Sequence, residues 1–225
     1  MRPRSTAWYE ARIAIGLSSL LPALLLPAYA LLQGFFWQRG LAAPRLFELV
    51  RSFELILPLA AGLAASRLMA VEREERFHAL RASYPEPRWR LPLLRTAGGL
   101  FVGTVAWVAG ALIYRLAYGP YPAAEVLLPA LAPALYLLGL SLLVGNLSGS
   151  YWTAAGTVLS YWCFEVFKQG ELTGVLFLFD RTWPLRTVSY AANRWLLAAL
   201  GVALLLANVG VSVGRRRTRP KGGSA

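Results

Sequence analysis

Long runs of apolar residues alternate with short polar segments along nearly the whole chain. A helix needs about 20 mostly apolar residues to cross the hydrocarbon core of a bilayer. The pattern therefore predicts an all-α, polytopic membrane protein with six transmembrane helices, at about residues 13–37, 47–69, 97–118, 123–144, 151–167 and 195–213. A further apolar run, 172–179, is too short to cross. It predicts a re-entrant external segment between spans five and six, at about 170–189.

Two features of these spans leave alternatives open. The basic start, the first apolar run and Ala28-Tyr29-Ala30 also resemble a signal peptide with its cleavage site. The apolar run continues past that site to Phe36, which favours a retained first helix. Prolines inside spans one, two and four either set packing geometry or form a flexible gate. These prolines are Pro22, Pro27, Pro58, Pro129 and Pro133.

Composition and charge strengthen the membrane assignment. Of the 225 residues, 57% are hydrophobic and 15% are charged, whereas soluble domains carry about 25% charged residues. We expect one transmembrane domain over residues 1–214 and a basic, disordered cytoplasmic tail over 215–225.

The distribution of Lys and Arg predicts the orientation. The two termini and the loop after span two carry 15 of these residues, and the opposite side carries 8. Because positive loops stay in the cytoplasm, we predict a multi-pass protein of the cell (inner or plasma) membrane with both termini cytoplasmic. The net charge of +12 is assigned to orientation and to contacts with membrane lipids, not to nucleic acid.

The reactive side chains exclude several kinds of site. The chain has one cysteine, Cys163, and one histidine, His78, so neither a zinc site nor a Cys-His catalytic pair is expected. We predict no catalytic residue and no metal ligand. The sequence also lacks a Gly-x-x-x-x-Gly-Lys-Ser/Thr loop, so ATP is not expected to bind to this chain.

The long polar connection after span two, residues 70–96, carries the most information. Phe77, Leu80 and Tyr84 recur at i, i+3 and i+7 and therefore share one face of a helix. This helix is either a solvated surface helix or a docking helix for a cytoplasmic partner. The candidate docking residues are Glu72, Arg73, Glu74, Glu75, Arg76, Phe77, Leu80, Arg81, Tyr84 and Pro85.

This loop and the six-span layout resemble the permease subunit of a type 2 ATP-binding-cassette (ABC) transporter. The resemblance rests on Glu72-Arg73-Glu74, Leu80, Tyr84-Pro85 and Arg88-Trp89-Arg90, which follow one another as in the coupling helix of that family. Arg76 and Phe77 depart from the small residues, glycine and threonine, that are common there. The resemblance implies that residues 71–84 dock on a separate ABC ATPase subunit, which would bind ATP and Mg. It also implies a dimer with a second permease copy or a related permease.

Charged residues also lie within or beside the predicted spans. Arg51 and Glu54 share a face of span two and could form an ion pair. Glu165 lies three residues before Lys168, near the outer end of span five. Ionisable groups at membrane depth are functional candidates because their burial is costly. We interpret Arg51, Glu54 and Glu165 either as members of ion pairs at the outer interface or as part of an outer gate or a cargo contact.

These features together predict the permease subunit of an ATP-driven ABC transporter. The resemblance and the apolar, aromatic spans favour an exporter of a hydrophobic or amphiphilic cargo, such as a peptide, a drug or a lipid-like compound. The chain itself is not expected to be an enzyme. One alternative is a membrane-embedded lipid-modifying enzyme, for which only the scattered Glu54, Glu165 and Asp180 are available. The other is a non-transporting membrane scaffold or sensor.

Overall fold

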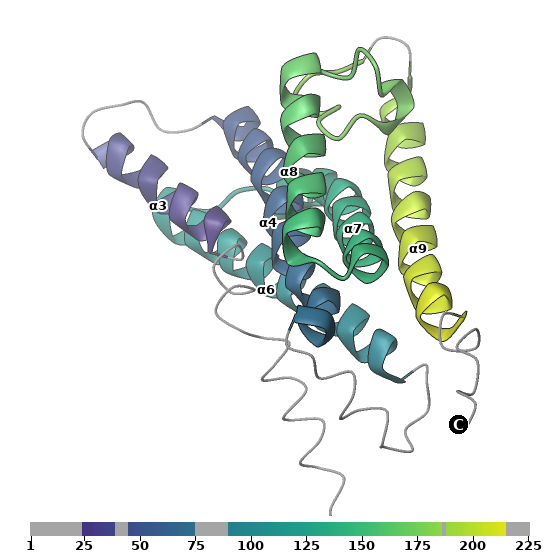
Figure 1. Cartoon of the computed structure of the whole chain (residues 1–225). Helices are drawn as coiled ribbons and strands as arrows, with labels where there is room; N and C mark the ends of the chain where they lie inside the picture. The colour runs from purple at the N-terminus through teal and green to yellow at the C-terminus, as the bar shows by residue number, and fades with distance from the viewer. Residues whose placement is uncertain (1–23, 39–44, 75–89, 186–187, 215–225) are drawn as a thin grey trace, which may run out of the picture.

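Six α-helices make up most of the part of the chain that the computed structural model describes, residues 24–38, 45–74, 90–185 and 188–214 (Figure 1). The helices are α3 (Leu25–Gln38), α4 (Leu46–Glu74), α6 (Arg90–Tyr118), α7 (Ala123–Ser148), α8 (Tyr151–Lys168) and α9 (Tyr190–Gly214). One short turn of 3-10 helix, η1 (Gly174–Leu176), lies between α8 and α9. These residues contain no β-strand, so the all-α prediction is confirmed for them.

Three of the helices are long and apolar enough to cross a membrane: residues 92–118 of α6, and the whole of α7 and α9. They coincide with predicted spans three, four and six. Helices α4 and α8 coincide with predicted spans two and five, and α3 covers the second half of span one. The first half of span one lies outside the described residues. The six-span layout therefore remains a prediction.

Helix α4 occupies the centre of the bundle. It packs against α3, α6, α7 and α8, while α9 packs mainly against α7 (Figure 1). Glycines permit the closest approaches. A Cβ at Gly62 of α4 would lie 2.7 Å from Cγ1 of Val158 in α8. A Cβ at Gly139 of α7 would lie 2.8 Å from the carbonyl oxygen of Gly201 in α9. Small residues at helix contacts are typical of membrane bundles, where backbones approach closely.

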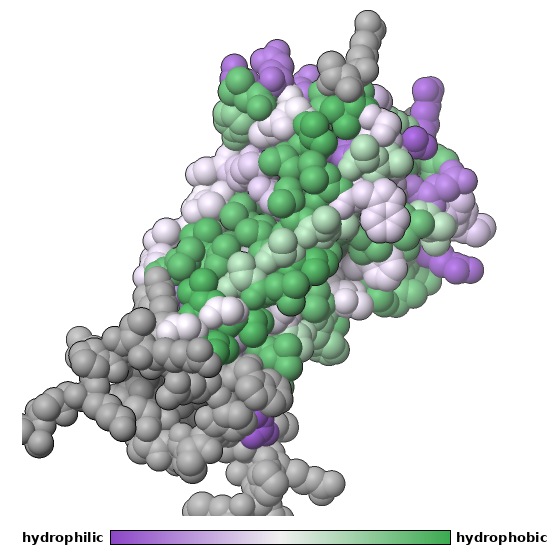
Figure 2. All heavy atoms as spheres, turned by 90° about the vertical axis from the view of Figure 1, so that its right-hand side faces the viewer, coloured by the Kyte–Doolittle hydropathy of each residue, from purple (hydrophilic) through white to green (hydrophobic). Residues whose placement is uncertain are grey.

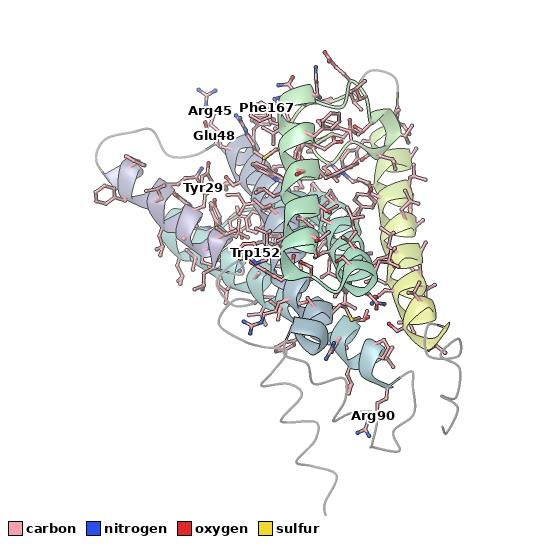
Figure 3. All side chains as sticks on the ribbon, viewed as in Figure 1. Tyr29, Arg45, Glu48, Arg90, Trp152 and Phe167 are labelled. Atoms are coloured by element: carbon pink, nitrogen blue, oxygen red, sulfur yellow. The ribbon has the colours of Figure 1, made fainter. Side chains whose placement is uncertain are left out.

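Large apolar side chains also cover the outside of the bundle. Leu116 is 85% exposed, Trp152 78% and Leu206 68%. Figure 2 shows a continuous hydrophobic area over the middle of one face, with hydrophilic residues mainly toward its upper end. Arg45 and Glu48 lie at one end of the bundle and Arg90 at the opposite end (Figure 3). Soluble monomers rarely expose apolar areas of this kind, whereas lipid tails would cover them.

The chain between α8 and α9 folds back over the ends of the helices. Gln169 and Gly170 have φ angles of 48° and 81°, in the left-handed region, and they reverse the chain after α8. Residues 169–185 are called the connecting segment below. Its residues Phe177, Leu178 and Phe179 are fully buried. The apolar run at 172–179 forms turns and η1 rather than a long helix, in line with the prediction that it is too short to cross.

Candidate functional site

Glu54, in α4, lies fully buried beneath the connecting segment. Its Oε1 accepts a hydrogen bond from the backbone N–H of Arg181 at 3.0 Å. Its Oε2 accepts one from the N–H of Thr182 at 2.8 Å and another from Thr182 Oγ1 at 2.6 Å. Nη2 of Arg194, in α9, forms an ion pair with Oε1. Hydrogen bonds to a charged group are roughly twice as strong as neutral ones, so this carboxylate is a strong link between three parts of the chain.

Two residues near the start of α9, Asn193 and Arg194, also bind the connecting segment. Nη1 of Arg194 donates to the carbonyl oxygen of Leu178 at 2.9 Å. Nδ2 of Asn193 donates to the carbonyl oxygens of Val175 and Phe177 at 2.8 and 2.9 Å. The guanidinium group of Arg194 also lies 4.9 Å from the ring centre of Tyr190. The connecting segment is thereby fixed to both α4 and α9.

The interpretation of Arg51 and Glu54 as an ion pair at the interface is wrong. Glu54 points into the bundle and pairs with Arg194, whereas Arg51 is exposed and its guanidinium group lies 5.3 Å from the ring centre of Trp183. Arg51 and Glu54 are three positions apart on α4, but their side chains contact different partners. Protein atoms of the connecting segment, and not water at an interface, surround the carboxylate of Glu54.

Glu165, in the last turns of α8, is also fully buried, but its surroundings differ. No basic side chain pairs with it among the residues that the structure describes. The hydroxyl of Thr173, the N–H of Leu178 and the hydroxyl of Tyr161 face its carboxyl group. The hydroxyl of Tyr161 also donates to the carbonyl oxygen of Leu176 at 3.3 Å. The interpretation of Glu165 as an ion pair with Lys168 at the interface is wrong, because Glu165 is buried and Lys168 is exposed.

The two glutamates belong to one region of the bundle. Nε1 of Trp162, in α8, donates to the carbonyl oxygen of Leu55 in α4 at 2.7 Å, directly beside Glu54. The ring of Trp162 also meets that of Phe179 at 6.2 Å between centres. The structure therefore brings Glu54 and Glu165 beneath the same connecting segment and leaves Arg51 on its outer edge.

Sequence reasoning missed Arg181, Thr182, Asn193 and Arg194 as site residues. The hydropathy pattern placed the start of span six at residue 195, so Asn193 and Arg194 were assigned to a loop. The only signal in the sequence was the position of these two polar side chains directly before an apolar run. Their partners lie on distant elements, and spacing along the chain does not reveal them.

The candidate docking residues fall at the opposite end of α4. Glu72, Arg73 and Glu74 lie in its last turn. The remaining ones lie outside the described residues: Glu75, Arg76, Phe77, Leu80, Arg81, Tyr84 and Pro85. Their docking role remains a prediction.

Comparison with known proteins assigns no family. No protein-family model matches the chain, and no curated protein matches it. Over its described residues the chain is all-helical, with three helices able to span a membrane and a buried charged site beneath the connecting segment.

Proposed function

We propose that the chain is the permease subunit of an ATP-driven ABC transporter that exports a hydrophobic or amphiphilic cargo. The observation that supports this proposal is the course of α4. This one helix contains Glu54 toward one end and finishes at Glu74, among the candidate docking residues. The 20 positions between these residues correspond to about 30 Å of helix, the thickness of a bilayer core.

A continuous helix of this length can carry movement from one membrane face to the other. In the proposed mechanism, closure of two ATPase subunits moves the docking segments at 71–84 together. The movement displaces α4 as a rigid element and changes the contacts of Glu54 with the connecting segment. Pro58, one turn after Glu54, removes a backbone donor inside α4 and supplies a point at which the helix can bend.

Docking on an ATPase is the step that tests the proposal. Leu80→Asp places a charge on the proposed contact face, and Ala79→Asp places the same charge on a neighbouring face of the helix. We expect tagged wild-type protein and Ala79→Asp, purified in mild detergent from the native host, to recover an ATPase with a Walker A motif. Leu80→Asp should lose it.

Two outcomes would contradict the proposal. One is recovery of the ATPase by Leu80→Asp at the wild-type level, which would remove the docking helix from the mechanism. The other is the absence of any such ATPase with folded wild-type protein, which would favour the enzyme or scaffold alternatives. Size-exclusion chromatography of all three proteins separates loss of docking from loss of folding.

A further inference from the structure

The buried residues of α9 form a single narrow stripe along the helix. The stripe consists of Asn193, Leu197, Gly201, Leu205 and Asn208. These positions are three or four apart, so they share one face of the helix. An asparagine lies at each end of the stripe, and residues 195–207 carry no amide, hydroxyl or charged side chain. Polar side chains therefore fix α9 to the bundle only near its two ends.

The end of the stripe at Asn208 joins three helices. Nδ2 of Asn146, in α7, lies 2.9 Å from Oδ1 of Asn208 and 3.0 Å from its carbonyl oxygen. The same nitrogen lies 2.7 Å from Oγ of Ser212, one turn further along α9. Nδ2 of Asn208 donates to Oγ1 of Thr96, in α6, at 3.4 Å. These four residues are called the Asn208 cluster below, and they attach α9 to both α6 and α7.

The end of the stripe at Asn193 holds the connecting segment. Asn193 donates to the carbonyl oxygens of Val175 and Phe177, and the adjacent Arg194 pairs with Glu54. Asn193 and Asn208 are 15 positions apart, which corresponds to about 22 Å of helix. One continuous helix therefore joins two polar contacts at opposite ends of the bundle.

The backbones of α7 and α9 touch midway between these two contacts. A Cβ at Gly139 would lie 2.8 Å from the carbonyl oxygen of Gly201, and a Cβ at Gly201 would lie 2.9 Å from the carbonyl carbon of Leu135. Gly201 is near the centre of the stripe, and neither glycine has a side chain that must repack when α9 turns about this point. Unlike α4 and α7, α9 contains no proline at which it would bend. A displacement of one end of α9 is therefore carried to the other end.

We propose that α9 acts as a lever that couples the Asn208 cluster to the docking of the connecting segment, with the contact of Gly139 and Gly201 as its pivot. With the cluster intact, α9 holds Asn193 and Arg194 against the connecting segment. When the hydrogen bonds of the cluster are lost, the opposite end of α9 shifts and the connecting segment opens more often. The coupling is reciprocal, so release of the connecting segment also loosens the cluster. This inference does not rest on the proposed transport function.

Hydrogen–deuterium exchange of the backbone amides of Arg181 and Thr182 measures the opening of the connecting segment, because both amides donate to Glu54. Asn208→Leu removes the hydrogen bonds of the cluster, and Ala207→Leu, an exposed change at the adjacent position, is the matched control. We expect both amides to exchange about threefold to tenfold faster in Asn208→Leu and at the wild-type rate in the control. Amides in the middle of α8 should keep their wild-type rates, which separates coupling from a general loss of stability.

A second variant keeps the test decisive if Asn208→Leu does not fold. Asn146→Ala removes the hydrogen bonds from the side of α7 and leaves α9 unchanged, and it should accelerate the same two amides. The proposal is overturned if both amides keep their wild-type rates in a folded variant of the cluster, or if Ala207→Leu accelerates them equally.

The reciprocal measurement uses the backbone amide of Ser212. This amide should exchange faster in Glu54→Ala than in Glu48→Ala, because release of the connecting segment loosens the far end of α9. Equal rates for the Ser212 amide in these two variants would also overturn the proposal, since a coupling between two sites acts in both directions.

Discussion

Glu54 and Glu165 are both fully buried glutamates beneath the connecting segment, yet their environments are opposite. The carboxylate of Glu54 receives two backbone N–H groups, the hydroxyl of Thr182 and the guanidinium group of Arg194. The carboxyl group of Glu165 faces two hydroxyls and one N–H, and no basic side chain pairs with it among the residues described. The ion pair and hydrogen bonds of Glu54 tie distant elements together, whereas Glu165 lies among neutral groups.

The origin of the neighbours explains the difference. Arg181, Thr182 and Arg194 lie 127, 128 and 140 positions after Glu54, so this contact joins distant parts of the chain. Thr173 follows Glu165 by only eight positions and reaches it through the turn at Gln169 and Gly170. The first site therefore depends on the whole bundle, and the second depends mainly on one tight return of the chain.

The largest effect is expected from Glu54→Ala. The change leaves the half-buried Arg194 without its carboxylate partner and removes the acceptor of three further hydrogen bonds. We expect a loss of about 3–5 kcal/mol in the free energy of unfolding, measured by denaturant titration in detergent. Glu48→Ala, an exposed change in the same helix, should cost less than about 1 kcal/mol. Equal losses of unfolding free energy for the two variants would contradict the role of Glu54 as a link between α4, the connecting segment and α9.

A matched pair of threonine changes sharpens the comparison. Thr182→Val removes a 2.6 Å hydrogen bond to a carboxylate and should cost about 1.5–3 kcal/mol. Thr173→Val removes a hydroxyl that faces a carboxyl group without an ion-pair partner, so it should cost less, about 0.5–1.5 kcal/mol. Differential scanning fluorimetry of the two variants side by side measures the contrast. A larger loss for Thr173→Val would mean that the contact of Thr173 with Glu165, and not that of Thr182 with Glu54, is the stronger one.

The turn that carries Thr173 is tested by Gly170→Ala. The added methyl group would lie 2.8 Å from Cγ of Phe177 at a residue with φ of 81°, and we expect a loss of about 1–3 kcal/mol. Gly156→Ala in α8 is the control, because nothing lies within 4 Å of its Cβ position and alanine favours a helix. That variant should gain up to about 1 kcal/mol. Thermal unfolding measures both variants. A Tm for Gly170→Ala equal to that of wild type would show that the chain reversal after α8 does not need glycine.

The smallest effect is expected from Glu165→Gln. The change replaces a buried carboxyl group that pairs with no basic side chain among the described residues by a neutral amide of the same size, so the free energy of unfolding should stay within about 1 kcal/mol of wild type or rise. Denaturant titration measures it under the conditions used for Glu54→Ala. A loss as large as that of Glu54→Ala would mean that Glu165 has partners of similar strength.

The helices themselves follow largely from the sequence. Long apolar runs predict α4, α6, α7, α8 and α9 to within a few residues at most ends, because a continuous apolar run of that length has few alternatives to a buried or membrane helix. The largest deviation is the start of α6, at Arg90 instead of about residue 97. Polar residues at a helix end lower the hydropathy without ending the helix.

The site could be predicted only in part. The cost of burying charge drew attention to Glu54 and Glu165. The local i, i+3 rule then assigned Arg51 to Glu54, but the side chain that pairs with it is Arg194, on another helix. Hydropathy also placed Asn193 and Arg194 outside span six, although both fall within the first two turns of α9. Contacts between distant segments decide such partners, and a single sequence does not contain them.

The central claim is that Glu54 holds the connecting segment on α4, the helix that leads to the proposed docking loop. Hydrogen–deuterium exchange of the backbone amides of Arg181 and Thr182 tests it most directly, since both donate to Glu54. We expect both amides to be protected in wild type and to exchange at least tenfold faster in Glu54→Ala, where a tenfold change corresponds to about 1.4 kcal/mol of opening free energy. Glu48→Ala, the exposed change in the same helix, should leave both amides at their wild-type exchange rates. Unchanged protection of Arg181 and Thr182 in the variant would contradict the account.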